Sequence, residues 1–403
     1  MTGALDGIRV VDLTVWFQGP VAGQHLADFG AEVIHVERPQ GGDLGRGVRS
    51  IKALPVGDWN QYFLVINRNK KSMAVDLNKP AGRDIVHRLV AESDVFLSNL
   101  SPSALARWQL SYDDLAQRNP RLVYALGSGY GPYGEITKPS FDLTVQALTG
   151  LMPRLGEPGE PPIYLGMGSG DAMGGLMAAL GIVLALYARE QTGRGQFLDA
   201  SLYGAQLFMA APSLQAYLAT GSPRFAEQQS RKQPQNPLWN TYPTKDRWVF
   251  LCLADEGDAW ERLCRTLEDR ALAADPRFDD VRGRRRHAAE LVEALDRVLA
   301  GRTAAEWVER WRAAGLAASP IGTLADLAAD PQAWETRYFV ETFCEEVQRD
   351  VVVRGLPIGL GRTPGTVRSL GPELGQHTEE ILTGTLGYSW EQVGEMKEQG
   401  VIL

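Results

Sequence analysis

The first part of the chain alternates short apolar runs with amphipathic stretches, a pattern typical of an α/β fold. Residues 8–14 and 31–37 each predict a buried strand, and residues 21–29 between them predict a helix that begins after Gly19-Pro20. A strand, a helix and a second strand in so short a segment form a βαβ unit with parallel strands. The same pattern then predicts strands at 72–77, 95–99 and 122–126 and a helix at 79–91.

The ends of these strands indicate where a ligand would bind. Open parallel sheets bind ligands beyond the carboxyl ends of their strands. Arg38 follows the second strand, and Asn99 and Leu100 follow the fourth. We therefore expect these three residues near a binding site.

The pattern changes near residue 210. A polar, turn-rich stretch leads into a predicted β-hairpin at 240–253, and amphipathic helices follow at about 257–270, 286–300 and 303–314. A strand at 351–353 and a helical tail at 378–399 complete the chain. The predicted organisation is a large domain at 1–210, a connector at 211–237, a small α+β domain at 238–325 and a C-terminal segment at 326–403.

Composition narrows the class of protein. The 403 residues include 44% hydrophobic and 22% charged residues, as in ordinary globular proteins. The net charge of −8 does not favour binding to nucleic acid, which needs a basic face. The N-terminus lacks the pattern of a secretory signal, and the apolar run 176–188 is shorter than a membrane span, so we expect it to form a buried helix.

The three cysteines are Cys252, Cys264 and Cys344, and their spacing fits neither a zinc site nor a disulfide framework. We therefore expect a reducing, cytoplasmic setting, no bound metal and no membrane association.

The most unusual stretch is 166–175, Gly-Met-Gly-Ser-Gly-Asp-Ala-Met-Gly-Gly, which places a lone carboxylate, Asp171, before the apolar run. One interpretation is a helix cap, a common role of aspartate. A second is a dinucleotide-binding loop after a strand at 163–165. That interpretation is disfavoured because a carboxylate at a helix N-terminus would repel a pyrophosphate.

A third interpretation makes Asp171 a catalytic nucleophile. N–H groups at the helix end would keep it ionised, and the glycines would admit an activated acyl group. N–H groups of the glycine loop could also stabilise the oxyanion that forms when a carboxylate attacks a thioester.

Other nucleophiles and bases are less convincing. Ser169 is displaced from the centre of a Gly-x-Ser-x-Gly motif. His25 and His87 fall in predicted helices and His35 in a predicted strand, so we interpret all three as packing or surface residues.

Motifs spread over nearly the whole chain resemble the class III CoA-transferases, a family that also contains formyl-CoA transferase and α-methylacyl-CoA racemase. The segments that carry the resemblance are 5–14, 19–20, 26–34, 36–43, 67–77, 131–133, 141–150, 170–171, 192–196, 330–331, 374–378 and 400–402. Their order and spacing together are highly specific.

The resemblance implies a Rossmann-like large domain, built from the N-terminal part and the C-terminal tail, with a small α+β domain between them. It also implies a homodimer of two chains interlocked as rings. Coenzyme A and acyl-CoA would be substrates, and no permanently bound cofactor is implied.

The resemblance also assigns roles to residues. Asp171 matches the aspartate that carries the acyl group and then CoA. The positions that match CoA-binding residues are Arg38, Val75, Leu77, Asn99, Leu100 and Arg107. Taken alone, the arginines would be ordinary surface residues, but guanidinium groups also suit phosphate.

Two departures from the family pattern bear on the reaction. Phe141 stands where the racemases have a histidine, and a phenyl ring cannot transfer a proton, so racemisation is disfavoured. Gln18 lies one position from the glutamine of formyl-CoA transferases, with Phe17 in the matching place, and no tetraglycine loop follows residue 220. Trp16, Phe17, Phe141, Trp239 and Tyr242 indicate an acyl group larger than formate.

The sequence thus predicts an enzyme that moves CoA between two carboxylic acids through intermediates on Asp171, with Gln18 as a further site residue. Two alternatives remain at this stage. One is an acyl-CoA racemase, and the other is a CoA-binding protein without activity in which Asp171 only caps a helix.

Overall fold

A computed structural model describes residues 3–50, 57–134, 139–253 and 257–403 of the chain. The chain forms two compact units. The first contains Met1–Leu151, Tyr164–Gln215 and Gln332–Leu403, and the second contains Met152–Ile163 and Ala216–Pro331. The predicted domain boundaries stay predictions.

The first unit is built on a six-stranded sheet. Its strands, in chain order, are β1 (Arg9–Leu13), β2 (Glu32–Glu37), β3 (Lys71–Ala74), β4 (Val95–Ser98), β5 (Val123–Leu126) and β6 (Phe197–Asp199). The spatial order is β3-β2-β1-β4-β5-β6, and every pairing is parallel. The predicted α/β fold with a parallel sheet is confirmed. The strand order reverses between β1 and β4, where such sheets open a crevice for ligands.

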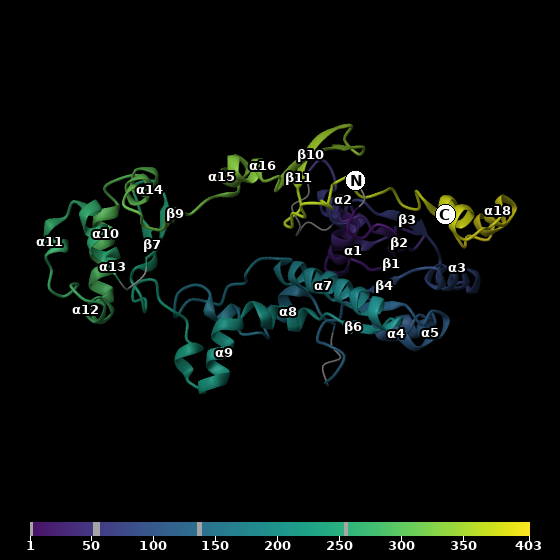
Figure 1. Ribbon diagram of the computed structural model, residues 1–403, viewed down its shortest axis with the longest axis horizontal. Helices are drawn as coiled ribbons and strands as arrows, with labels where there is room; N and C mark the ends of the chain where they lie inside the picture. Colours follow the sequence, from purple (N-terminus) through teal and green to yellow (C-terminus); the bar gives the residue numbers. More distant parts are fainter. Residues whose placement is uncertain (1–2, 51–56, 135–138, 254–256) are drawn as a thin grey trace. The chain divides into compact units, whose positions relative to one another are not determined.

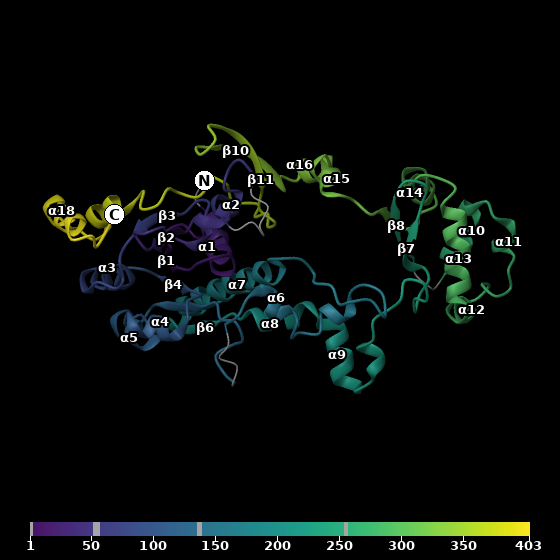
Figure 2. The ribbon, with the colours of Figure 1, turned by 180° about the vertical axis from the view of Figure 1, so that it is seen from behind.

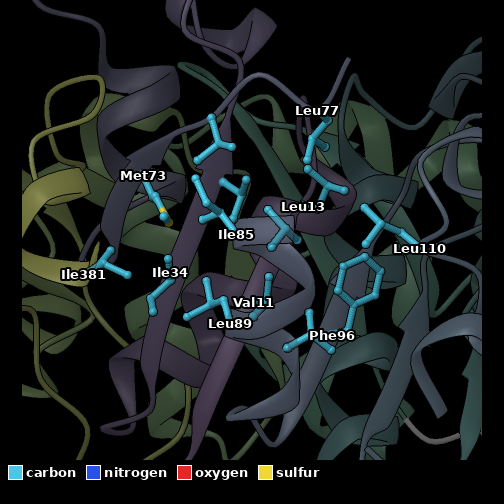
Figure 3. Packing of buried hydrophobic residues seen from close by; sticks show 14 of the residues in the cluster. Val11, Leu13, Ile34, Met73, Leu77, Ile85, Leu89, Phe96, Leu110 and Ile381 are labelled. Carbon is cyan, nitrogen blue, oxygen red and sulfur yellow. The ribbon is translucent and has the colours of Figure 1, made fainter. Parts of the chain in front are cut away.

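Helices cover both faces of this sheet (Figure 1). One face packs against α3 (Pro80–Ala91), α5 (Tyr112–Arg118) and the C-terminal segment. Figure 3 shows part of this core, in which Ile85 and Leu89 of α3 lie against Val11 and Phe96 of the sheet. The other face packs against α1 (Gln18–Asp28) and α7 (Ser169–Thr192). Burial on both faces explains why consecutive apolar residues occur in the strands, as in Val95-Phe96-Leu97 of β4.

Helix α7 differs from its prediction. It has 24 residues and is long and apolar enough to cross a membrane by length and composition, a test that core helices of soluble proteins also pass. The predicted helix is confirmed, but it is longer than the apolar run 176–188 and is only partly buried. Ala178, Ile182 and Ala185 face the core, whereas Leu184 and Tyr187 are 59% and 68% exposed.

The close packing of α1 on α7 depends on a glycine. A Cβ atom on Gly175 would lie 2.6 Å from the carbonyl oxygen of Gln18 and 2.8 Å from Val21 Cγ1. Only a residue without a side chain fits there.

Three local predictions are corrected. Residues 163–165 are irregular rather than a strand, because Leu165 N donates to the Gln146 side chain. The connector contains a helix, α9 (Ala211–Thr220). The tail is not one helix: α17 (Thr378–Glu380) and a π-helical turn (Ile381–Thr385) are separated from α18 (Trp390–Glu398) by Gly387, whose φ is +69°.

The remaining elements of the chain are short. They are the 3₁₀ helices Leu44–Ser50, Met152–Arg154 and Pro223–Phe225, the strands β10 (Phe339–Cys344) and β11 (Arg349–Arg354), and the helices α2 (Gln61–Ile66), α4 (Pro102–Arg107), α6 (Asp142–Gln146), α8 (Leu202–Met209), α11 (Arg270–Ala273), α12 (Val281–Arg286), α15 (Leu324–Ala328) and α16 (Pro331–Glu335). The predicted strand at 351–353 lies within β11.

The second unit contains an antiparallel sheet of β7 (Trp239–Pro243), β8 (Trp248–Cys252) and β9 (Ala318–Pro320). Its main helices are α10 (Ala259–Leu267), α13 (Ala288–Leu299) and α14 (Ala304–Ala313), which gather beside β7 and β8 (Figure 2). The predicted hairpin and amphipathic helices are confirmed. Tyr242 was expected near a substrate, but it is fully buried in this core and its hydroxyl donates to the Pro237 carbonyl.

Candidate active site

A cavity of about 370 Å³ lies at the carboxyl ends of β1 to β4. Its lining includes five of the residues predicted to bind CoA, namely Arg38, Val75, Leu77, Leu100 and Arg107. Residues from four separate strand ends or the segments after them are thus brought to one edge of the sheet. The rule that such sheets bind ligands at this edge therefore located the cavity correctly.

The cavity, which also carries the carboxyl groups of Glu37, Asp43 and Asp76, is lined by two arginines, Arg38 and Arg107. Both side chains are exposed, and neither has a carboxylate partner among the residues that the structure describes. Arg38 Nε donates to the Gly42 carbonyl at 3.1 Å, and the Arg107 guanidinium lies 5.3 Å from the centre of the Trp108 ring. Guanidinium groups without counter-ions suit phosphate, which they bind through paired hydrogen bonds.

Asn99 and Gln18 are not among the residues that line this cavity. Asn99 instead holds the loop that follows β1, because its side chain accepts from Val15 N at 2.9 Å and donates to the Val15 carbonyl at 2.8 Å. Gln18 is buried, and its Nε2 donates to the Ala200 carbonyl at 2.9 Å. Gln18 also packs against Gly174, one turn after Asp171.

Asp171 lies in the first turn of α7, but it does not cap the helix. The N-cap position is Gly168, in the left-handed conformation with φ +81°. The carboxylate that binds the first N–H groups belongs to Asp142, which accepts from Gly168 N at 2.6 Å and Gly170 N at 3.0 Å. The capping role predicted for Asp171 was wrong because another carboxylate occupies those donors.

The protonation of Asp171 also differs from expectation. Burial, together with the negative charge of Asp142, raises the pKa of the Asp171 carboxyl from 3.8 to about 7. Among the described part of the chain, no hydrogen bond to its carboxyl group is formed. The helix end therefore does not keep Asp171 ionised, and Gly168 N and Gly170 N are not free to stabilise an oxyanion.

The glycines of 166–175 were expected to make room for an acyl group, but two of them make room for side chains of the same chain. A Cβ atom on Gly170 would meet Gln206 Nε2 at 2.0 Å and Asp142 Oδ1 at 2.3 Å, and one on Gly174 would meet Gln18 Nε2 at 3.0 Å. These glycines admit side chains of the same chain. Gly166 and Gly168 have φ values of +127° and +81°, which glycine adopts readily.

Tyr62 on α2 is a site residue that the sequence did not reveal. Its ring lies 5.6 Å from that of Phe17. Burial and the negative charges of Asp171 and Asp43 raise the pKa of its hydroxyl. No motif marked Tyr62, because only the fold brings α2 close to the start of α7.

A buried ionic cluster supports the loop after β1. His35 is fully buried, with Nδ1 3.4 Å from Asp12 Oδ2 and Nε2 3.6 Å from Asp43 Oδ2. Lys70 Nζ lies 2.7 Å from the same Asp12 oxygen, and Trp16 N donates to Asp43 Oδ1 at 3.2 Å. His35 lies in a strand, as predicted, but it is an ionic partner and not a simple packing residue.

The part of the chain that the structure describes contains no candidate metal site. Within the described residues, no group of three or more histidine, cysteine, aspartate or glutamate side chains could hold an ion. The cysteines at 252, 264 and 344 are free thiols.

Comparison with known proteins gives the family. CoA-transferase family III matches residues 5–378. The chain is 34% identical over 409 aligned residues to an acyl-CoA transferase of Fusarium pseudograminearum, covering 99% of this chain and 88% of that protein. It is 32% identical over 407 residues to succinyl-CoA–D-citramalate CoA-transferase of Chloroflexus aurantiacus, covering 99% and 98%.

A solved structure agrees. The crystal structure of a CaiB/BaiF family protein from Brucella suis matches with a TM-score of 0.83 and 30% identity, over 95% of this chain and all of that one. The parallel sheet, the cavity at its carboxyl edge and these similarities lead to one assignment. The chain belongs to CoA-transferase family III and is a class III CoA-transferase.

Proposed function

We propose that the enzyme moves CoA from an acyl-CoA donor to a free carboxylic acid through covalent intermediates on Asp171. The observation that carries this proposal is the state of the Asp171 carboxyl group. It is largely buried at a glycine-rich turn, accepts no hydrogen bond from the residues that the structure describes, and has a pKa of about 7. A carboxylate without donors is a better nucleophile than one that is hydrogen-bonded.

The first half of the reaction cleaves the donor. An ionised Asp171 oxygen attacks the thioester carbonyl, the carbon–sulfur bond breaks, and CoA leaves as a thiolate while a mixed anhydride forms. The thiolate then attacks Cγ of Asp171, which releases the donor acid as a carboxylate and leaves an aspartyl-CoA thioester.

The second half repeats these steps with the acceptor. The acceptor carboxylate attacks Cγ and displaces the CoA thiolate to form a second anhydride. The thiolate attacks the acyl carbon of the acceptor, which gives the new acyl-CoA and frees Asp171. No net proton is consumed, because both acids enter and leave as carboxylates.

The cavity supports this function. Arg38 and Arg107 would bind the phosphates of CoA. Val75, Leu77 and Leu100 would line the rest of the bound CoA. Asn99 and Gln18 would act by holding the loops around it.

A racemase is the weaker candidate. Phe141 is 63% exposed at the start of α6, directly before the Asp142 that binds the glycine turn, so its position has no acid or base. After incubation with a chiral 2-methylacyl-CoA in D₂O and no acceptor, we expect no deuterium at the α-carbon. Deuterium at that carbon would favour the racemase.

A homodimer is also proposed, with the two chains interlocked as the resemblance implies. The exposed side chains Leu176, Leu180, Leu184 and Tyr187 recur at helical spacing along α7 and form an apolar stripe. A second chain that covered this stripe would remove it from water.

The function is tested by a screen of acyl-CoA and free-acid pairs that includes succinyl-CoA as a donor, read by mass spectrometry of the CoA esters. We expect transfer with at least one pair, a loss of at least about 10³-fold in Asp171→Asn, and retained CoA binding by that variant. Asp171→Asn with full transfer activity would instead favour a nucleophile elsewhere, and no transfer with any pair would favour a CoA-binding protein without activity.

A further inference from the structure

We infer that Asp142 is the positioning residue for Asp171: it fixes the turn that carries Asp171 and takes the backbone donors that would otherwise bind the Asp171 carboxyl. This inference rests on the proposed function, in which Asp171 is the reactive carboxylate. Asp142 itself does not contact the reacting atoms. It acts through the main chain of the glycine turn and through its charge.

The first support is a pair of short hydrogen bonds. Asp142 is only 6% exposed, and its two oxygens each accept from a different glycine of the turn. Oδ2 accepts from Gly168 N at 2.6 Å, and Oδ1 accepts from Gly170 N at 3.0 Å. A two-point contact with both oxygens fixes the orientation of the peptide groups directly before Asp171.

The second support comes from the next turn of α6. Gln146 Nε2 donates to both Asp142 oxygens, at 3.2 and 3.3 Å, and to the Gly166 carbonyl at 3.1 Å. Its Oε1 accepts from Leu165 N at 3.0 Å. Asp142 and Gln146 therefore bind backbone groups of the turn from Leu165 to Gly170, the residue before Asp171.

The third support comes from α8. Gln206 Nε2 donates to Asp142 Oδ1 at 3.1 Å and to the Asp142 carbonyl at 3.3 Å. A Cβ atom at position 170 would lie 2.3 Å from Asp142 Oδ1, so the carboxylate occupies space that only glycine leaves open. Three helices thus converge on this one carboxylate.

The arrangement divides the donors unequally between two neighbouring carboxyl groups. Asp142 receives four N–H donors, from Gly168, Gly170, Gln146 and Gln206, and none of these reaches Asp171. The negative charge of Asp142 opposes ionisation of Asp171.

Among the described residues, the titratable groups that interact electrostatically with Asp171 are Asp142 on α6 and Tyr62 on α2. Burial is the larger cause of the raised pKa of Asp171, and the negative charge of Asp142 adds to it. The result is a carboxylate that is basic enough to attack a thioester and is not held back by donors.

A direct titration of Asp171 tests the inference without any substrate. The full-length chain is deuterated and labelled with ¹³C at aspartate Cγ, and the Asp171 signal is assigned by its absence in Asp171→Asn. In the wild type we expect a titration midpoint near pH 7. In Asp142→Asn the opposing charge is gone, and we expect the midpoint to fall by more than about one pH unit.

Two further variants separate this role from packing. Gln206→Met keeps the charge of Asp142 and both of its backbone bonds, so its midpoint should stay near pH 7. Asp114→Asn removes a carboxylate that caps another helix, α5, through Ser111 N at 3.2 Å. That variant should lose thermal stability without any shift in the Asp171 midpoint.

An unchanged midpoint in Asp142→Asn, or an equal fall in Gln206→Met, would overturn the inference. If Asp142→Asn does not fold, a wild-type midpoint near 3.8 would overturn it on its own. Failure of the proposed function looks different: the midpoints shift as expected, but no acyl-CoA and acid pair is turned over. Transfer that depends on Asp171, with a midpoint insensitive to position 142, would contradict only the role of Asp142.

Discussion

At the scale of single residues, the loop after β1 depends on charges buried beneath it. His35 lies between Asp12 and Asp43, and Asp43 Oδ1 accepts from Trp16 N in that loop. Burial lowers the pKa of His35, but the attraction of its ring N–H groups to the Asp12 and Asp43 carboxylates outweighs burial and raises the pKa to about 10. His35 is therefore a cation at neutral pH that holds two carboxylates together.

This state makes the contribution of His35 to stability depend on pH. Because the pKa is raised from 6.5 to about 10, protonation stabilises the fold fully below pH 6.5 and stops doing so as the pH rises through 10. We expect the free energy of unfolding of the wild type to exceed that of His35→Asn by an amount that shrinks between pH 7 and pH 10. The change should be on the order of a few kcal/mol. Urea unfolding at several pH values measures it.

The matched control is His287→Asn in the second unit, where the imidazole lies on the surface beside Glu290. The difference in the free energy of unfolding between the wild type and His287→Asn should not shrink in the same way between pH 7 and pH 10. A difference for His35→Asn that stays constant to pH 10 would contradict a charged His35.

At the scale of elements, the contact between α1 and α7 is set by missing side chains. In Gly175→Ala the added Cβ would meet backbone and Val21 at under 3 Å, so we expect a loss of about 1–3 kcal/mol of stability. Gly181→Ala, two turns later, would meet only the flexible Leu198 side chain at 3.3 Å and should gain roughly 0.5–1 kcal/mol. Thermal or urea unfolding of both variants checks the pair. Equal changes in stability for the two variants would mean that helix propensity, and not packing against α1, determines the effect of each substitution.

Elements that depend on local pattern were predictable from the sequence, whereas the start of α7 was not. The strands of the parallel sheet are buried on both faces, so their apolar runs and the Gly19-Pro20 signal sufficed to place β1, α1 and β2. The carboxylate that binds the first N–H groups of α7 is 28 positions earlier in the chain, at Asp142. No local pattern distinguishes that arrangement from an aspartate cap at Asp171.

The same distinction applies to the site. Arg38 and Leu100 follow strands, so the topology alone brought them to the cavity. Tyr62 and Asp43 lie on segments after β2, whose paths depend on tertiary contacts such as the bond from Trp16 N to Asp43. The family motif included Asp142 and Gln146, but their hydrogen bonds to the glycine turn required the folded chain.

At the scale of the whole molecule, the exposed apolar stripe on α7 favours the proposed dimer. Interlocked chains cannot separate without unfolding, so an interlocked dimer should not exchange chains with other dimers. We expect a mixture of tagged and untagged protein to show no mixed dimers by native mass spectrometry after a day. Mixed dimers should appear only after unfolding and refolding together. Rapid exchange would exclude interlocking, and a monomeric mass would exclude the dimer.

In the proposed reaction, Asp171 carries the acyl group and then CoA. The most direct measurement is peptide mass spectrometry of enzyme quenched during turnover, with and without hydroxylamine. With the donor found in the substrate screen, we predict a CoA adduct on the peptide that contains Asp171, and hydroxylamine should convert it to an aspartyl hydroxamate. Turnover with no adduct at Asp171, or an adduct on another residue, would contradict the account.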